Sequence, residues 1–201
     1  MNPVEASASS AEKILLAATD LFAANHFNGV SIKEIAKKSG VNSALISYYF
    51  GGKKNLYQEV LNEQSNLFLN LIARVSSKDI APLAKLREYI TAISEVQKLH
   101  PHRIHLIYRE LLTPTFMCDS FIKNRLYKIH KFMSELVTEA IADGSIHNNM
   151  QPTHVAFTLE SIIVFFFLTH DQIRDLGHFK NGTENTYLEE ALNTYLSSIT
   201  N

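Results

Sequence analysis

Two adjacent lysines, Lys53 and Lys54, follow the glycine pair Gly51 and Gly52 at a point where a helix is predicted to begin. The N-terminus of a helix carries a partial positive charge, so two ammonium groups placed there are mildly unfavourable. They become favourable when an anion binds at the same place, because backbone N–H groups and lysines then attract it together. We interpret the pair as a candidate phosphate-binding site. A pair of solvated lysines is the alternative.

Other candidate metal-binding or catalytic residues are less informative. The segment "HPHRIH" places His100, His102 and His105 within six residues, a density that can indicate zinc. Pro101 is predicted to open a helix, however, and histidines two positions apart on a helix point in different directions. We therefore predict surface histidines, no metal site and no cofactor. The sequence has no G-x-S-x-G, H-E-x-x-H, phosphate-loop or dinucleotide-binding motif, so we predict that the protein is not an enzyme.

The charge distribution favours a nucleic-acid-binding N-terminal part. The 201 residues carry a formal net charge of -1, so the chain as a whole is not a polycation. Residues 1–56 hold six lysines and four acidic residues, whereas the remainder holds 13 basic and 16 acidic residues. The asymmetry has the direction expected for a chain that contacts nucleic acid at its N-terminal end.

The single cysteine, Cys118, excludes an intrachain disulfide and is typical of a reducing compartment. The first ten residues lack the basic and apolar regions of a signal peptide. The longest apolar run, residues 162–168, is far shorter than the ~20 residues that a membrane span needs. We therefore expect a soluble cytoplasmic protein without a membrane partner.

Apolar residues recur three and four positions apart along the chain, with no sustained alternation, which predicts an all-α protein. Ser9 with Glu12, and Ser31 with Glu34, have the spacing of a capping box at a helix start. We predict nine helices, which begin near residues 10, 31, 42, 53, 82, 101, 119, 152 and 183.

The second and third predicted helices have the spacing of a helix-turn-helix. Ala36 stands where two helices approach closely, Gly40 stands where the turn needs a left-handed backbone, and Ile46 stands where a side chain packs back into the core. An ordinary pair of antiparallel helices is the alternative interpretation.

The segment Ile14 to Leu61, "ILLAATDLFAANHFNGVSIKEIAKKSGVNSALISYYFGGKKNLYQEVL", resembles the N-terminal domain of the tetracycline-repressor family of transcription factors. The matching features are "AA..LF", "SI..IA..SGV", "YYF" and "GGK..L". The resemblance implies a three-helix helix-turn-helix DNA-binding domain over residues 1–52. It also implies a helical effector-binding and dimerisation domain over residues 53–201.

In a helix-turn-helix the second helix of the pair enters the major groove of DNA with its N-terminal residues against the bases. We therefore expect DNA contacts from Asn42, Ser43, Ala44, Ser47 and Tyr48. Asn42 either binds adenine or only caps its helix, and Ala44 suits a thymine methyl group. The helix has no arginine, so we expect modest base recognition and some dependence on DNA shape.

Phosphate contacts are expected on both sides of this helix. Tyr49 is predicted to pack its ring in the small core, while in similar proteins such a tyrosine donates its hydroxyl to a phosphate. Phe50 is predicted to be a core residue. The remaining candidates for phosphate contacts are Ser31, Lys33, Lys37, Lys53 and Lys54.

The family resemblance implies a homodimer formed by the last two helices. Their apolar side chains exceed what one subunit easily covers, and burial in the subunit's own core is the alternative. The predicted interface residues are Leu159, Ile162, Ile163, Phe166, Leu188, Leu192 and Tyr195.

Polar residues among apolar neighbours in the middle helices are candidates for an effector pocket, namely His105, Tyr108, Arg109, Tyr127 and His130. For Arg109 the alternative is an ion pair with a nearby acid such as Glu135 or Glu160. The function expected from the resemblance is a ligand-responsive repressor that binds a pseudo-palindromic double-stranded DNA operator as a homodimer and is released by a small-molecule effector. Activation of transcription, and a helical interaction module without DNA affinity, are the alternatives.

Overall fold

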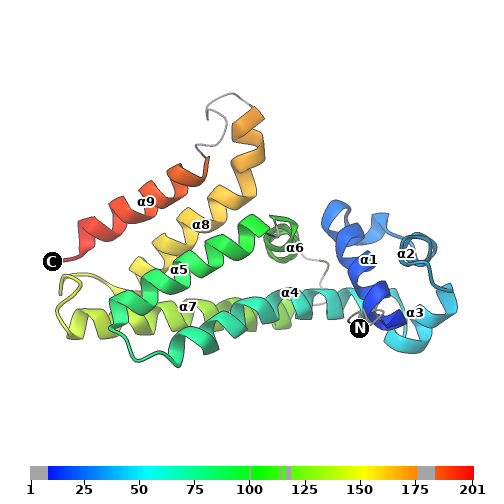
Figure 1. Ribbon diagram of the computed structural model, residues 1–201, viewed down its shortest axis with the longest axis horizontal. Helices are drawn as coiled ribbons and strands as arrows, with labels where there is room; N and C mark the ends of the chain where they lie inside the picture. Colours follow the sequence, from blue (N-terminus) through cyan, green and yellow to red (C-terminus); the bar gives the residue numbers. More distant parts are fainter. Residues whose placement is uncertain (1–8, 100, 114, 116–118, 176–183) are drawn as a thin grey trace, which may run out of the picture. The chain divides into compact units, whose positions relative to one another are not determined.

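The computed structural model describes residues 9–99, 101–113, 115, 119–175 and 184–201 (Figure 1). Nine α-helices lie within this part of the chain, so the all-α prediction is confirmed. Their bounds are α1 Ser10–Ala24, α2 Ile32–Ser39, α3 Ser43–Phe50, α4 Lys53–Ser76, α5 Pro82–Leu99, α6 Pro101–Leu112, α7 Asp119–Ala142, α8 Pro152–Asp175 and α9 Glu184–Ile199. A short 3-10 helix, η1 Phe27–Gly29, follows α1.

Both predicted capping boxes are present at the starts of α1 and α2. The Ser9 hydroxyl accepts from the Glu12 amide at 3.2 Å, and the Glu12 carboxylate accepts from the Ser9 amide at 2.6 Å. Ser31 and Glu34 repeat this arrangement at 3.2 and 2.7 Å. In each box the hydrogen bonds from the serine lower the pKa of the glutamate, because they stabilise its charged form.

Glycines end the two short helices that follow. Gly40 after α2 and Gly51 after α3 have φ angles of 69° and 71°, in the left-handed region that other residues rarely adopt. A Cβ atom at Gly40 would meet no heavy atom within 4 Å, so the backbone conformation alone requires glycine there. The predicted role of Gly40 in the turn is thereby confirmed.

The chain divides into two compact units. Unit 1 comprises Met1–Ser65 and Leu106–Asp119, and unit 2 comprises Asn66–His105 and Ser120–Asn201. Helices α4 and α6 each pass from one unit into the other. The division into domains at residues 52 and 53 stays a prediction.

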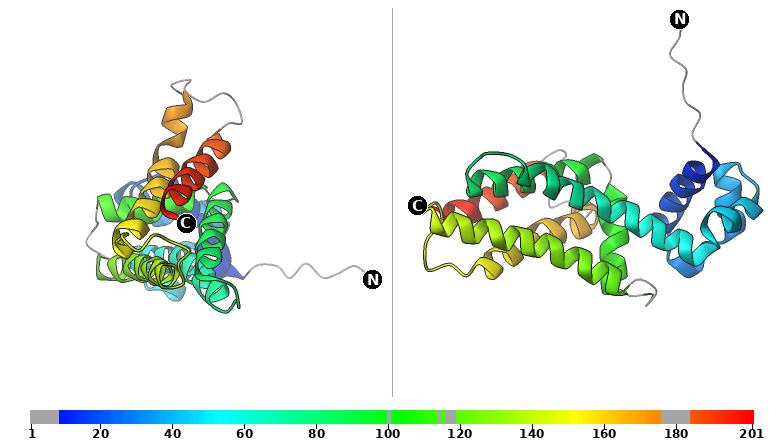
Figure 2. Two further views of the ribbon diagram at one scale, coloured as in Figure 1. Left: turned by 90° about the vertical axis from the view of Figure 1, so that its left-hand side faces the viewer. Right: turned by 90° about the horizontal axis from the view of Figure 1, so that it is seen from below.

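In unit 1, α1 packs on α2 and α3, and α2 packs on α3. The fully buried side chains there include Ile14, Phe22, Ile35, Ile46 and Leu56, so the predicted inward position of Ile46 is confirmed. In unit 2, α8 packs on α9, as Figure 1 and Figure 2 also show. Its core includes Leu86, Tyr89, Met133, Val137 and Leu159.

Helix α8 is unusually apolar. Its segment Pro152–Thr169 has a mean hydropathy of 1.5 and is long enough to cross a membrane by length and composition alone. A core helix of a soluble protein satisfies the same test, so this finding is weak support for a membrane segment. Only 33% of the segment is buried within the single chain, which leaves much of its surface uncovered by the described residues.

Candidate nucleic-acid interface

Helix α3 buries one side chain and exposes most of the others. Ile46 is fully buried, whereas the side chains on the remaining faces are exposed, with Tyr48 79% accessible. The exposed residues at and along this helix are Asn42, Ser43, Ala44, Ser47, Tyr48 and Tyr49, which are the residues predicted to lie at DNA. Unit 1 therefore presents a helix whose outward surface consists of small, hydroxyl-bearing and aromatic side chains without charge.

The prediction that Tyr49 packs its ring in the small core is wrong. Its side chain is 46% exposed, and its ring lies edge-on to that of Tyr48 with centroids 5.0 Å apart. Phe50, predicted to be core, is half-buried. Ile46 is the one fully buried residue of α3, so the buried face of this helix is narrow. Tyr48 and Tyr49 lie outside that face and are exposed.

Asn42 is the N-cap of α3. Its side-chain oxygen accepts a hydrogen bond from the Ala44 amide at 2.9 Å, which satisfies one of the free donors at the helix start. The structure therefore gives the capping role to Asn42. Its side-chain nitrogen keeps two donors, so a contact between Asn42 and a base stays a prediction.

Lys53, at the first position of α4, is not simply solvated. Its ammonium group lies 4.2 Å from the centroid of the Phe27 ring in η1, a favourable cation–π distance. Partial burial lowers the pKa of Lys53, and the nearby negative charge of Glu34 opposes that effect. Lys54 is exposed. The ring thus offsets part of the cost of a positive charge at a helix N-terminus.

The second candidate phosphate region is the start of α2. The Ser31 hydroxyl is occupied by the capping box, whereas Lys33 and Lys37 are exposed. Lys38 instead forms an ion pair with Asp20 on α1 at 2.9 Å. The cations of unit 1 that remain available to phosphates in this region are therefore Lys33 and Lys37.

The five predicted effector residues belong to both units: Tyr108 and Arg109 to unit 1, and His105, Tyr127 and His130 to unit 2. A shared effector pocket stays a prediction. In unit 2, His105 Nε2 lies 2.8 Å from the carbonyl oxygen of Phe167, and Tyr127 is 64% exposed. His130 Nδ1 lies 3.0 Å from Glu160 Oε2.

Tyr108 is half-buried on α6, within unit 1. Burial raises the pKa of Glu160, and its hydrogen bond with His130 opposes that rise. In unit 2 a cavity of about 430 Å³ lies between α5 and α9, where Arg87, Lys98 and Glu189 contribute to its lining. No predicted effector residue lines it.

The described partners of Arg109, Glu135 and Glu160 do not include the ion pair that was the alternative for Arg109. Glu135 pairs with Lys131 at 3.5 Å, and Glu160 pairs with His130. The guanidinium of Arg109 instead donates to the carbonyl oxygens of Phe22 and of Ala23, the latter at 3.3 Å. These carbonyls belong to the last turn of α1, where no further turn of helix supplies their partners.

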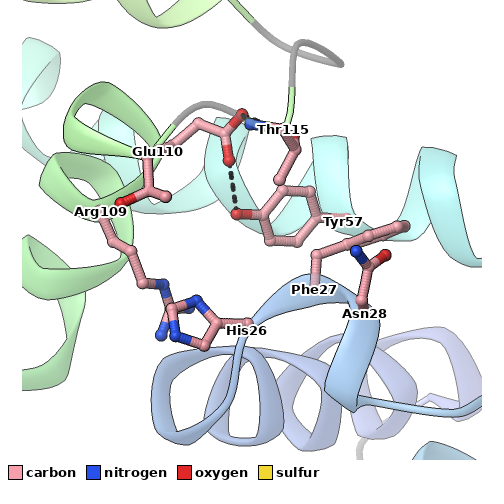
Figure 3. A pocket seen from close by; sticks show the side chains of 8 residues that line it. His26, Phe27, Asn28, Tyr57, Arg109, Glu110 and Thr115 are labelled. Atoms are coloured by element: carbon pink, nitrogen blue, oxygen red, sulfur yellow. Dashed lines mark hydrogen bonds between the residues drawn. The ribbon is translucent and has the colours of Figure 1, made fainter.

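A cavity of about 530 Å³ in unit 1 was not foreseen from the sequence (Figure 3). Glu110, which is only 3% exposed, accepts hydrogen bonds there from the Tyr57 hydroxyl at 2.8 Å and from the Thr115 amide and hydroxyl at 2.9 and 2.6 Å. The cavity is lined by His26, Phe27, Asn28, Tyr57, Arg109, Glu110, Thr113 and Thr115. The sequence feature that could have indicated this site is Glu110 itself, an acid one turn after Leu106 on the apolar face of α6.

The predicted dimer residues mostly face inward. Leu159, Ile163, Phe166, Leu188 and Leu192 are buried within the single subunit, and Ile162 and Tyr195 are half-buried. The exposed apolar side chains of these helices are instead Phe157 and Phe165 on α8, each 66% accessible, and Tyr187 on α9, 48% accessible. The five buried residues therefore lie in the core of the single subunit, which was the alternative interpretation.

The three histidines of "HPHRIH" are only partly described by the structure. His100 lies outside the described residues, and the side chain of His102 is not described. Among the side chains that the structure describes, no group of three or more histidine, cysteine or acidic residues could hold a metal ion.

Comparison with known proteins relates the chain to one family model and to several regulators. The family model described as "Bacterial regulatory proteins, tetR family" matches residues 14–60. The HTH-type transcriptional regulator RutR of Escherichia coli (strain K12) is 30% identical over 146 residues, which cover 73% of this chain and 68% of that protein. The HTH-type transcriptional repressor KstR2 of Mycolicibacterium smegmatis is 24% identical over 148 residues, covering 71% and 70% of the two chains.

Among solved structures, AibR in complex with isovaleryl coenzyme A and operator DNA has a TM-score of 0.75 with this chain. The alignment covers 92% of this chain and 97% of AibR at 22% identity. At that level of identity the similarity shows a shared fold.

Substitutions at Asn42 separate capping from base recognition. Asn42→Ser keeps a good N-cap, so we expect unchanged stability, whereas Asn42→Ala removes the cap and should cost about 1 kcal/mol of unfolding free energy. Urea denaturation measures both values. Binding of each variant to a DNA duplex then decides the second role: a marked loss for Asn42→Ser at unchanged stability would contradict a purely capping function.

Proposed function

The chain belongs to the tetR family of bacterial regulatory proteins, and on that premise we propose that it is a repressor which leaves its operator when a small molecule binds. As a member of this family it is a DNA-binding transcriptional regulator and not an enzyme. The observation that carries the proposal is the outward face of α3, which is held at both ends by caps and exposes Ser43, Ala44, Ser47 and Tyr48.

The exposed face of α3 suits insertion into a major groove. Its small side chains allow close approach, the serine hydroxyls bond to either donor or acceptor edges, and Ala44 suits a thymine methyl group. Because the face carries no charge, affinity must come mainly from phosphate contacts. We assign these contacts to Lys53, Lys54 and Lys33, with the Tyr48 and Tyr49 hydroxyls as further donors.

The names of relatives support repression by release. KstR2 of Mycolicibacterium smegmatis and NicS of Pseudomonas putida are both named transcriptional repressors. AibR is described in complex with both operator DNA and isovaleryl coenzyme A, so a similar fold accommodates DNA and a small molecule. Activation of transcription remains the second candidate, which the sign of regulation in a reporter assay distinguishes. We place the protein in the cytoplasm, where operator DNA is accessible.

The uncovered surface of α8 supports a homodimer. About two thirds of the apolar segment Pro152–Thr169 is not buried within the chain, and Phe157 and Phe165 project from it with 66% of their surface accessible. Large exposed apolar surfaces mark sites of association. We therefore propose an interface centred on the exposed face of α8 that carries Phe157 and Phe165, eight residues apart, in place of the buried residues. A two-fold dimer places two recognition helices on half-sites about 34–36 Å apart.

Affinity selection of sheared genomic DNA on the purified protein, without added ligand, tests the proposed function. We expect enrichment of a pseudo-palindromic sequence, because two identical α3 helices related by a two-fold axis bind identical half-sites. Sequencing of the retained fragments gives the result. Enrichment of no sequence over the input DNA would contradict an operator-binding protein in its ligand-free state.

The lysines at the start of α4 should contribute to affinity without selecting sequence. Lys53→Ala and Lys54→Ala should each weaken binding to all duplexes alike and lower the slope of log K against log salt by about one. Fluorescence anisotropy at several salt concentrations measures the slope. Lys78→Ala, which removes a lysine paired with Glu88 in unit 2, is the matched control and should leave the slope unchanged. A loss restricted to one sequence would refute the assignment to phosphates.

A charge on the exposed face of α8 should separate the subunits. Phe165→Glu would place a carboxylate at the proposed interface in both copies, so we expect monomers at micromolar concentration. Sedimentation velocity measures the mass. Leu16→Glu, at a residue of α1 that is 67% exposed, is the control and should remain dimeric. A Phe165→Glu variant that stays dimeric would exclude this face.

A further inference from the structure

The Phe27 ring in η1 is held in place by the core of unit 1. It stacks on the ring of Phe22, with centroids 5.9 Å apart and an interplanar angle of 18°. Its other neighbour is the Tyr57 ring, whose centroid lies 5.0 Å away (Figure 3). Phe22 and Tyr57 are almost completely buried, so a shift of either ring would disturb close packing. The position of Phe27 is therefore fixed from within the fold.

Phe27 itself is only half-buried, and a charge lies over its ring. The ammonium group of Lys53 lies 4.2 Å from the ring centroid, within the range in which a cation is attracted to the negative face of an aromatic ring. Lys54, the next residue, is exposed and has no ring against its ammonium group among the described residues. Two adjacent lysines with the same predicted role therefore differ in their surroundings.

Other charges also act on the Lys53 ammonium group. The N-terminus of α4 repels a cation, because the helix dipole is positive there. The carboxylate of Glu34, in the capping box of α2, attracts it, but partial burial outweighs this attraction and lowers the pKa of Lys53. A partly desolvated ammonium group gains more from an aromatic ring than a fully solvated one does. The contact with Phe27 is therefore favourable where the helix dipole alone is not.

A lysine that is already held in place loses less freedom when it binds an anion. Its side chain has several rotatable bonds, and ordering them against a phosphate costs conformational entropy. The Phe27 ring accepts no conventional hydrogen bond, so the N–H donors of Lys53 stay available to phosphate oxygens. Lys38 shows the contrast, since its ion pair with Asp20 at 2.9 Å neutralises the charge. Phe27 thus orders Lys53 without neutralising it.

We propose that Phe27 is a positioning residue for DNA binding, and that its ring holds the ammonium group of Lys53 for contact with a backbone phosphate. This inference rests on the proposed function and adds to it a residue of η1, outside the helix-turn-helix itself. The contacts that support it all lie within unit 1. A ring that instead withheld the ammonium group from DNA would have the opposite effect on affinity, so the sign of the effect is decisive.

A double-mutant cycle between Phe27 and Lys53 tests the proposal on the full chain. The probes are the duplex enriched in the genomic selection and a duplex of the same length and shuffled sequence. Fluorescence anisotropy measures the affinities of the wild type, Phe27→Leu, Lys53→Ala and the double variant, and urea denaturation checks that each is folded. We expect Phe27→Leu to weaken binding to both duplexes by about two- to fivefold, the range that an exposed cation–π contact supplies. In the Lys53→Ala background it should cause no further loss.

Lys54→Ala provides the matched background. Because Lys54 has no ring contact among the described residues, Phe27→Leu should weaken binding by the same factor in Lys54→Ala as in the wild type. Where Phe27→Leu does not fold, pentafluorophenylalanine at position 27 is the second variant. It nearly keeps the shape of the ring but removes the negative potential of its face, so it should weaken binding in the wild type and not in Lys53→Ala.

The outcomes separate the two proposals. Equal losses from Phe27→Leu in the wild type and in Lys53→Ala would mean that Phe27 acts through the fold. Unchanged or raised affinity would mean that the ring does not present Lys53 to DNA. Either result would overturn the inference while DNA binding stands. A wild-type protein that binds neither duplex at low salt would instead overturn the proposed function, together with the inference that rests on it.

Discussion

The arrangement of the DNA-binding helices depends on how two helices of eight residues satisfy the polar groups at their ends. Helices this short are not stable alone, because only a few intrahelical hydrogen bonds offset the cost of ordering the chain. Helix α2 begins with the reciprocal bonds of Ser31 and Glu34 and ends at Gly40, whose φ of 69° turns the chain. Helix α3 begins with the cap from Asn42 and ends at Gly51. Once both ends are satisfied in this way, burial of Ile46 is enough to fix which face of α3 is left outward.

These features could be predicted because each is local in sequence. A capping box lies within four residues, a left-handed turn favours glycine, and Ile46 occupies the single inward position of a short helix. The prediction of a core position for Tyr49 was wrong because a helix of two turns buries few side chains, and in α3 the buried position belongs to Ile46. Propensity and periodicity predict that a helix forms, but they do not give the width of its buried face.

Helix α8 shows a different limit, because a helix that is apolar on nearly all sides has no periodicity by which to orient it. Leu159, Ile163 and Phe166 were predicted to lie at the interface, but they pack inward. Phe157 and Phe165 are exposed instead. Polar residues in the middle helices show a related limit. Their backbone partners, such as the α1 carbonyls bonded by Arg109, leave no sequence pattern of their own. Glu110 does have a signal, an acid on the apolar face of α6, but the sequence analysis did not predict a buried site from it.

Arg109 and Glu110 are consecutive, and their hydrogen bonds together fix the orientation of the last turn of α6 in unit 1. Successive residues on a helix point about 100° apart, so one side chain contacts α1 while the next contacts Tyr57 on α4. A rotation of α6 that relieves one contact therefore strains the other. Loss of a hydrogen bond to a buried group costs about 1–3 kcal/mol. Both contacts therefore favour the same orientation of the last turn of α6 relative to α1 and Tyr57.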